Sequence, residues 1–181
     1  MALVKGGSGT FQLEGTNTYT GGTFINQGSL IVSIYGAGGA LPLADDPTKG
    51  LVVSSGSFQA YIANSINPGN EVTINANSSV LLSGDNTIKK LTFNNDGSST
   101  AGYLRTFAGN QQNGAGSRGV LTIGVGGLAA TSANVASTAY VEGRLDFGAN
   151  PNVINVAPIS AGGFVSTSST RPYSLDSVAV R

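Results

Sequence analysis

The apolar residues of this chain come in short bursts in which every second residue is apolar. Examples are Val72 and Ile74, Val80 and Leu82, and Leu91 and Phe93. Because successive side chains of a β-strand point to opposite faces, alternation over about four to six residues predicts strands with one buried face. Turn-forming residues such as Asn67-Pro68-Gly69 separate the bursts. No useful stretch has the period of an amphipathic helix, so the sequence predicts an all-β chain.

The composition removes several classes of function. The 181 residues include 27 Gly but no Cys, His or Trp, and the formal net charge is zero. Without thiols and imidazoles there is no ligand set for a zinc finger, an iron–sulfur cluster or haem, and no Cys–His or Ser–His nucleophile pair. Neutral charge without a Lys/Arg cluster argues against nucleic acid or an anionic membrane as partner. We therefore expect no cofactor, no metal site and no membrane insertion by this segment.

Two architectures fit a run of short strands: an antiparallel sandwich or barrel, and a β-solenoid whose strands stack lap upon lap. Bursts near residues 73, 81 and 92 lie about nine residues apart, so three bursts make a lap of about 20–23 residues. Residues 13–26 also align without gaps on residues 82–95, an offset of three laps of about 23 residues. These features favour a single parallel β-helical segment over residues 1–181, with three strands per lap and a repeat at 74–95 related to one at 5–30.

Some positions are predicted to shape the column without binding anything. Asn17 and Asn86 each follow a Gly-x step at a strand end, so we place them at corners where they hydrogen-bond along the stack. Residues 35–48 and 108–119 are irregular and rich in Gly, Pro and Asn, and are predicted to be loop insertions that leave the column. Such loops are either tolerated insertions or binding loops, and we favour the first.

The charged residues do not form a predicted active site. Glycoside-cleaving solenoids need carboxylates on one outward face, whereas Glu14 and Asp85 fall three laps apart, or about 14 Å at roughly 4.8 Å per lap. Asp45-Asp46 is the only adjacent acidic pair, and we interpret it as a solvated loop in preference to a calcium site. The basic pair Lys89-Lys90 is predicted at an edge or corner. We therefore expect no catalytic residues and no enzymatic activity.

The six tyrosines are scattered along the chain, and core or corner packing is the preferred interpretation of them. If several lined one face, they could instead stack against sugars. They are Tyr19, Tyr35, Tyr61, Tyr103, Tyr140 and Tyr173.

Residues 5–30 resemble a known family motif. They follow the pattern K-x-G-x-G-T-x-x-L-x-G-x-N-T-Y-T-G-G-T-x-I-x-x-G-x-L of the autotransporter-associated β-strand repeat, also called the passenger-associated transport repeat. The positions assigned to the structural repeat are Gly9, Leu13, Gly15, Asn17, Thr18, Tyr19, Gly21, Gly22, Thr23, Asn26, Gly28 and Leu30. Residues 143–156 are similar, more weakly, to the segment that separates such repeats.

This resemblance implies a right-handed parallel β-helix that is exported across the outer membrane of a Gram-negative bacterium. It also implies a signal peptide and, as a partner, a C-terminal β-barrel translocator in the parent protein. Neither is recognisable here, so we expect an excised passenger segment or a relative secreted by another route.

The expected function is a structural and interaction segment at the cell surface: a stalk, adhesin body or fibre unit whose sequential folding assists its own export. Host or matrix surfaces and identical subunits are the expected partners. The alternatives are a self-assembling extracellular filament, a β-helical protein that binds or degrades polysaccharides, and an antiparallel sandwich adhesin.

Overall fold

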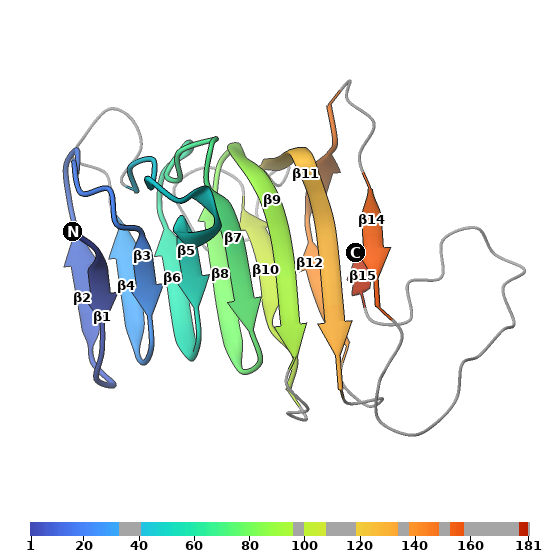
Figure 1. The fold of residues 1–181 in the computed structure, drawn as a ribbon, viewed down its shortest axis with the longest axis horizontal. Coiled ribbons are helices and arrows are strands. Elements are labelled where there is room, and N and C mark those ends of the chain that lie inside the picture. The colour runs from blue at the N-terminus through green and yellow to red at the C-terminus, as the bar shows by residue number, and fades with distance from the viewer. Residues whose placement is uncertain are drawn as a thin grey trace, which may run out of the picture.

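A computed structural model describes residues 1–32, 41–95, 100–107, 119–133, 138–148 and 153–157, together with the backbone of β15, Val178–Val180. Regular structure in these residues is β except for one short 3₁₀ turn, η1 (Pro47–Lys49). Every strand pairing is parallel, which settles the choice of architecture against the antiparallel sandwich (Figure 1). None of the described residues form a helix with the length and apolar character needed to cross a lipid bilayer.

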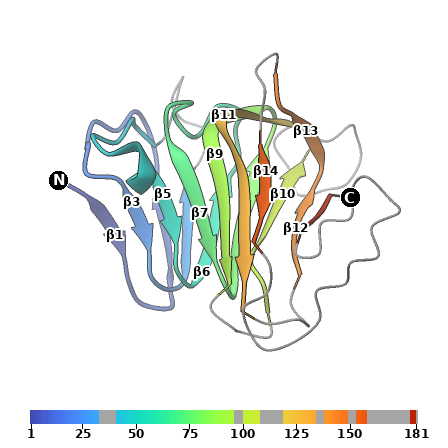
Figure 2. The ribbon, with the colours of Figure 1, turned by 45° about the vertical axis from the view of Figure 1, so that its right-hand side comes forward.

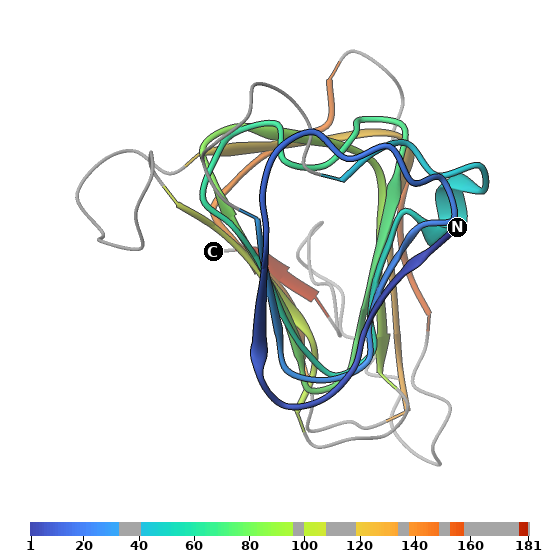
Figure 3. The ribbon, with the colours of Figure 1, turned by 90° about the vertical axis from the view of Figure 1, so that its left-hand side faces the viewer.

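The strands form two sheets between which the chain alternates. Sheet A contains β1 (Leu3–Lys5), β3 (Thr23–Ile25), β5 (Leu51–Val53), β7 (Glu71–Asn75), β9 (Asn86–Asn95), β11 (Val120–Ser132) and β13 (Arg144–Asp146), with β14 (Ile154–Val156) also paired to β11. Sheet B contains β2 (Thr10–Leu13), β4 (Ser29–Val32), β6 (Gly56–Ala60), β8 (Ser78–Ser83), β10 (Tyr103–Phe107), β12 (Ala139–Glu142) and β15. Figures 2 and 3 show the two sheets on either side of a common interior, with successive laps one behind the other.

The laps differ in length although the strands stay in register. Paired residues lie 19 positions apart for Asn75 and Asn94, 28 for Ser29 and Ser57, and 37 for Asn95 and Ser132. The prediction of a uniform lap of about 20–23 residues is therefore wrong. Extra residues enter the connections between strands, where they do not disturb the ladder of backbone hydrogen bonds.

The third predicted strand of each lap is present only in part among the described residues. Leu41 and Ile66 form an isolated parallel bridge outside both sheets. Further along, β11 changes register between Ile123 and Gly127, and pairs with β13 before that shift and with β14 after it. Each described lap thus gives one strand to each sheet. In addition, the long strands β9 and β11 pair with each other over a short stretch that precedes the register shift.

The internal repeat matches the structure in sheet B and slips by one residue in sheet A. Leu13 pairs with Val32, Val32 with Ala60, and Ala60 with Leu82, so Leu13 and Leu82 share one column three laps apart. In sheet A the column that starts at Thr23 reaches Leu91 and not Thr92. A one-residue slip exchanges the two faces of a strand. This explains why Phe24 is half-buried whereas Phe93, its counterpart in the gap-free alignment, is buried.

The apolar bursts build one continuous core. Residues that pair from strand to strand form columns along the stack, and the inward columns of both sheets contain buried apolar side chains. These side chains form a single cluster. In sheet B this column comprises Leu30, Phe58, Val80, Leu104 and Val141. Phe11 begins the same column but is 46% exposed, whereas Leu30 next to it is 0% exposed. The difference arises because β2 has a neighbouring strand on one side only.

Buried asparagines tie neighbouring laps together at the corners. The Oδ1 atom of Asn86 accepts a hydrogen bond from the Ser65 N–H at 3.0 Å, one lap earlier, and its Nδ2 donates to the Ser83 carbonyl. Asn70 uses the same device, accepting from the Ala44 N–H and donating to the Pro42 carbonyl. The predicted corner role of Asn86 is confirmed. Asn17 donates to the nearby Gly15 carbonyl at 3.2 Å, a contact within its own turn.

The two predicted loop insertions are described only in part. Of residues 35–48, the stretch from 41 onward is described, and there Leu41 and Ala44 are buried. This end of the segment packs against the core, which corrects the expectation that it leaves the column. The prediction for residues 108–119 lies outside the described residues except for Gly119, whose N–H donates to the Phe107 carbonyl.

Candidate functional site

The resemblance at the N-terminal end corresponds to two stacked laps. Leu3, Val4 and Lys5 of β1 pair with Thr23, Phe24 and Ile25 of β3, and β2 pairs in the same way with β4. The assigned repeat positions lie in these strands and in their connections: Gly9 precedes β2, the stretch from Gly15 to Gly22 joins β2 to β3, and Asn26 and Gly28 precede β4. The motif therefore specifies turns as much as strands.

The spacing of glycines in the motif has a direct cause at one corner. Gly28 has a φ of 75°, and a side chain there would place Cβ 2.4 Å from the Gly9 carbonyl oxygen. One lap further on, Gly56 has a φ of 115° and approaches the Gly28 carbonyl in the same way. Backbone hydrogen bonds run through this corner, from the Ser29 N–H to the Gly9 carbonyl and from the Ser57 N–H to the Gly28 carbonyl. Only glycine fits this close stacking of bends.

Three polar residues of the motif hold the bends around the first lap. The Nζ atom of Lys5 donates to the carbonyl oxygens of Gly6, Gly7 and Gln27, at 2.8, 2.7 and 3.2 Å. The hydroxyl groups of Tyr19 and Thr23 are hydrogen-bonded at 2.7 Å. Burial raises the pKa of the Tyr19 hydroxyl above its ordinary value, an effect that the bond to Thr23 partly opposes. These contacts are structural in character.

The outer end of the first lap presents an apolar hollow. It has a volume of about 380 Å³ and is lined by Leu3, Val4, Lys5, Gly6 and Phe11. Val4 is 59% exposed, and β1 and β2 each have a single paired neighbour among the described strands. This end of the stack therefore combines exposed apolar side chains with free strand edges.

Glu14, Asp85 and Glu71 each have their own structural partner. Glu14 accepts from Gln12 at 2.8 Å, and Asp85 accepts from the Val120 N–H at 2.8 Å, where it anchors the start of β11. Glu71 is paired with Lys89 at 3.1 Å. Lys89 and Lys90 lie within β9, an interior strand between β7 and β11, so their predicted place at a sheet edge is wrong. They lie beside the register shift of β11 between Ile123 and Gly127, and β7 pairs with β9 only from Lys90 onward. Among the described residues, no group of three or more acidic residues is placed to hold a metal ion. Asp96 and Asp176 lie outside the described residues.

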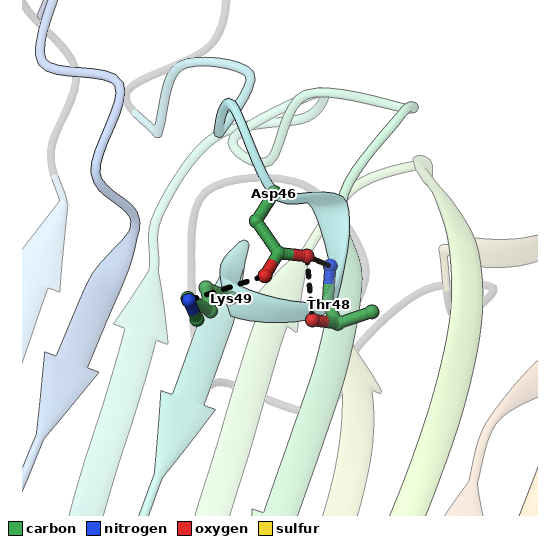
Figure 4. A network of polar contacts seen from close by, with 3 residues as sticks. All are labelled: Asp46, Thr48 and Lys49. Carbon is green, nitrogen blue, oxygen red and sulfur yellow. Dashed lines mark hydrogen bonds and ion pairs between the residues drawn. The ribbon is translucent and has the colours of Figure 1, made fainter.

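Asp46 of the adjacent acidic pair caps the 3₁₀ turn η1 (Figure 4). Its Oδ1 accepts from the backbone N–H and the hydroxyl of Thr48, at 3.1 and 2.6 Å, and its Oδ2 lies 3.2 Å from Lys49 Nζ. The Thr48 and Lys49 contacts lower the pKa of the Asp46 carboxyl below its ordinary value. Its neighbour Asp45 donates its backbone N–H to the Thr20 carbonyl. Asp46 thus caps the turn through its side chain, and Asp45 ties it to the preceding lap through its backbone.

A group of aromatic and charged side chains lies on the outer face of sheet B. We call Tyr103, Arg105, Phe107, Tyr140 and Glu142 the β10–β12 cluster. The rings of Tyr103 and Tyr140, paired residues of adjacent strands, stack with centroids 5.1 Å apart and an interplanar angle of 4°. Arg105 Nε lies 2.6 Å from Glu142 Oε2, and its guanidinium carbon lies 6.0 and 5.9 Å from the ring centroids of Tyr103 and Phe107. The alternate residues Leu104 and Val141 are buried, which places the cluster on the outward side.

Sequence reasoning missed this cluster. It treated Tyr103 and Tyr140 as scattered residues and did not single out Arg105 or Phe107. The pattern Tyr-x-Arg-x-Phe at 103–107 already places three side chains on one strand face, as does Tyr-x-Glu at 140–142. Their partnership was hidden by the lap length, since Arg105 and Glu142 are 37 residues apart. Of the other tyrosines, Tyr35 and Tyr173 lie outside the described residues.

The comparisons with known proteins concern the first two laps. Residues 3–32 match the family model of the passenger-associated-transport-repeat. No curated protein and no solved structure matches the chain. The repeat begins with β1 and ends with β4, so its boundaries coincide with two complete strand pairs, one in each sheet. The resemblance found from the motif at residues 5–30 is thereby confirmed.

Proposed function

We propose that this chain is a β-helical segment of a passenger that is secreted and displayed outside the cell, where it acts as a structural and interaction module. The observation that carries the proposal is the passenger-associated transport repeat in β1 to β4. A stack of parallel laps with one core supports it, because each new lap buries its apolar residues as soon as it meets the lap before. A closed, right-handed parallel β-helix is part of this proposal.

Such a stack can assist its own export. A lap that folds outside the membrane buries apolar area worth about 25 cal/mol per Å², and this free energy opposes its return. The partner required for this step is the translocator barrel of the parent protein. The role that we assign is non-enzymatic, and contact with a host or matrix surface would follow display.

Secretion of a fusion tests the proposal. The chain is placed between a signal peptide and an autotransporter translocator, and surface display is measured by protease accessibility on intact bacteria. Leu30→Asp places a charge in the buried column of β4, so we expect display to fall several-fold. Thr10→Asp changes an exposed residue of β2 and is the matched control. Equal display of both variants would contradict a role for lap folding in export.

A self-assembling filament is the second candidate. The apolar hollow at Leu3, Val4 and Phe11 and the free edges of β1 and β2 favour it, because another solenoid end could continue the stack there. Electron microscopy of the purified chain at micromolar concentration distinguishes the two. Long fibres that disappear in Val4→Lys would support the filament, whereas short uniform rods would contradict it.

A further inference from the structure

The outward face of sheet B changes character along the stack. Over β2, β4 and β6 its side chains are short or uncharged: Thr10, Gln12, Ser29, Ile31, Ser57 and Gln59. At β10 and β12 it carries the β10–β12 cluster, with two tyrosines, a phenylalanine and an ion pair. Tyrosine and arginine are the residues most enriched where proteins contact ligands and partners. The cluster therefore differs in composition from the part of this face that β2, β4 and β6 form.

The cluster is ordered by its own contacts. Arg105 bonds Glu142 across the strands and lies near the rings on both sides of it, so its guanidinium group is held in place. The side chains of Arg105 and Glu142 are nevertheless 37% and 21% exposed. The aromatic and charged groups are therefore fixed in position and accessible, which lowers the entropy cost of binding.

The charges restrict the ligand. The two charges of the cluster are paired, so the surface offers no net attraction to a polyanion. The apolar hollow lined by Leu3, Val4 and Phe11 lies at β1 and β2, at the other end of the stack from the cluster. A sugar suits both kinds of group: its C–H faces pack on aromatic rings, while neighbouring hydroxyls donate to a carboxylate and accept from a guanidinium group.

A row of hydroxyl groups leads toward the cluster. Ser29, Ser57, Ser79, Tyr103 and Tyr140 form one register column along the stack. The hydroxyls of Ser29 and Ser57 are 2.8 Å apart, which shows how closely this column aligns its polar atoms. Ser29 and Ser57 are half-buried whereas Ser79 is buried, so a polymer lying along the column would meet the first two hydroxyls and then the aromatic rings.

We infer that the β10–β12 cluster is a binding subsite for a neutral polysaccharide, with the exposed parts of Tyr103 and Tyr140 packing on a sugar ring and the Arg105–Glu142 pair binding its hydroxyls. The inference names the chemistry of the surface that the proposed passenger would contact, and only in that sense does it rest on the proposed function. Binding is measured on the purified chain, so its outcome is independent of whether the chain is exported.

Affinity electrophoresis tests the inference. The purified full chain is run in native gels that contain dextran, galactomannan or hydroxyethyl cellulose, neutral polymers of different linkage. Tyrosine fluorescence gives a second readout, because the chain has six Tyr and no Trp. We expect retardation in at least one gel and an apparent Kd raised about tenfold by Tyr103→Ala or Tyr140→Ala. Phe24→Ala, which removes a half-buried aromatic side chain from the outer face of sheet A, is the matched control and keeps the affinity of the unchanged chain.

The double variant Arg105→Gln with Glu142→Gln keeps the approximate shape of the pair without its charges. It is used for the binding test if an alanine variant fails to fold. We expect it to weaken binding as well. Absence of retardation in all three gels, or equal retardation of every variant, would overturn the inference. Retardation by dextran sulfate alone would replace it with an electrostatic surface. Loss of self-association in the same variants without any polysaccharide would replace it with an interface between copies.

Discussion

Glycines that look alike in the sequence have different tasks in the folded chain. Gly9 and Gly28 are both part of the repeat motif, but only Gly28 has a positive φ and a carbonyl oxygen where a side chain would go. At Gly9 an added Cβ would meet nothing within 4 Å. The motif indicates that both positions favour glycine without indicating which one the fold requires.

Gly28→Ala should therefore lower the free energy of unfolding by about 2–4 kcal/mol, through backbone strain and displacement of the Gly9 bend. Gly9→Ala is the control and should change it by less than about 1 kcal/mol. Thermal and urea unfolding of the two variants measure the difference. Equal stabilities would show that this corner does not constrain the stack.

Tyr19 should report its burial through its ionisation. Burial in the folded state raises the pKa of its hydroxyl. The stability that the neutral Tyr19 side chain contributes is therefore fully present below the ordinary tyrosine pKa and is lost as the pH rises through the higher folded value. In an alkaline titration of tyrosinate absorbance, Tyr19→Phe should remove the component that titrates late. Phe24→Leu, which changes a neighbouring aromatic side chain without a hydroxyl group, should leave that component in place.

At the scale of elements, the period of two predicted the strands well, because the same alternation that marks a strand also fills the core. The burst at Val80 and Leu82, for example, is fully buried in β8. The partners of the strands were harder to predict. A gap-free alignment cannot represent connections of unequal length, and one unaligned residue between Leu13 and Thr23 was enough to exchange the faces of β3.

The 3₁₀ turn η1 should depend on the ionised state of its cap. The contacts with Thr48 and Lys49 lower the pKa of Asp46. Their contribution to the stability of the fold is therefore present above the ordinary aspartate pKa and is lost as the pH falls through the lowered value. Carboxyl ¹³C NMR should show Asp46 titrating below the usual range. Thr48→Ala should move the midpoint back toward the ordinary value, and a midpoint that does not move would contradict the role of the Thr48 contacts.

For the whole molecule, repetition made the architecture predictable and the outer cluster unpredictable. Parallel stacking was predicted from the near-regular spacing of the apolar bursts, such as those near Ile74 and Phe93, together with the internal repeat. The β10–β12 cluster depends on which residues meet across a lap of 37 residues, and the local sequence holds no record of that pairing.

One whole lap should be removable from the stack without loss of the fold, whereas part of a lap should not. Deleting residues 29–56 joins Gly28 to Ser57, so Ser57 takes the place of Ser29, its register partner 28 residues earlier. We expect the shortened chain to keep parallel β structure, because β6 can then pair with β2 and β7 with β3. Deleting residues 43–56 removes half a lap and should abolish the fold by sending later strands to the wrong sheet. Circular dichroism and thermal unfolding distinguish the two, and similar spectra would contradict the lap as the structural unit.

The unequal laps also give the molecule a mechanical signature. Its strands lie across the long axis of the stack, so a force applied along that axis pulls on the hydrogen bonds between one lap and the next (Figure 1). Laps would detach singly, and each would release a length of chain set by its residues. At about 3.4 Å per residue, a lap of 19 residues releases about 65 Å and one of 37 about 126 Å. A stalk built in this way would extend under load by steps of different size, and would absorb work at each of them.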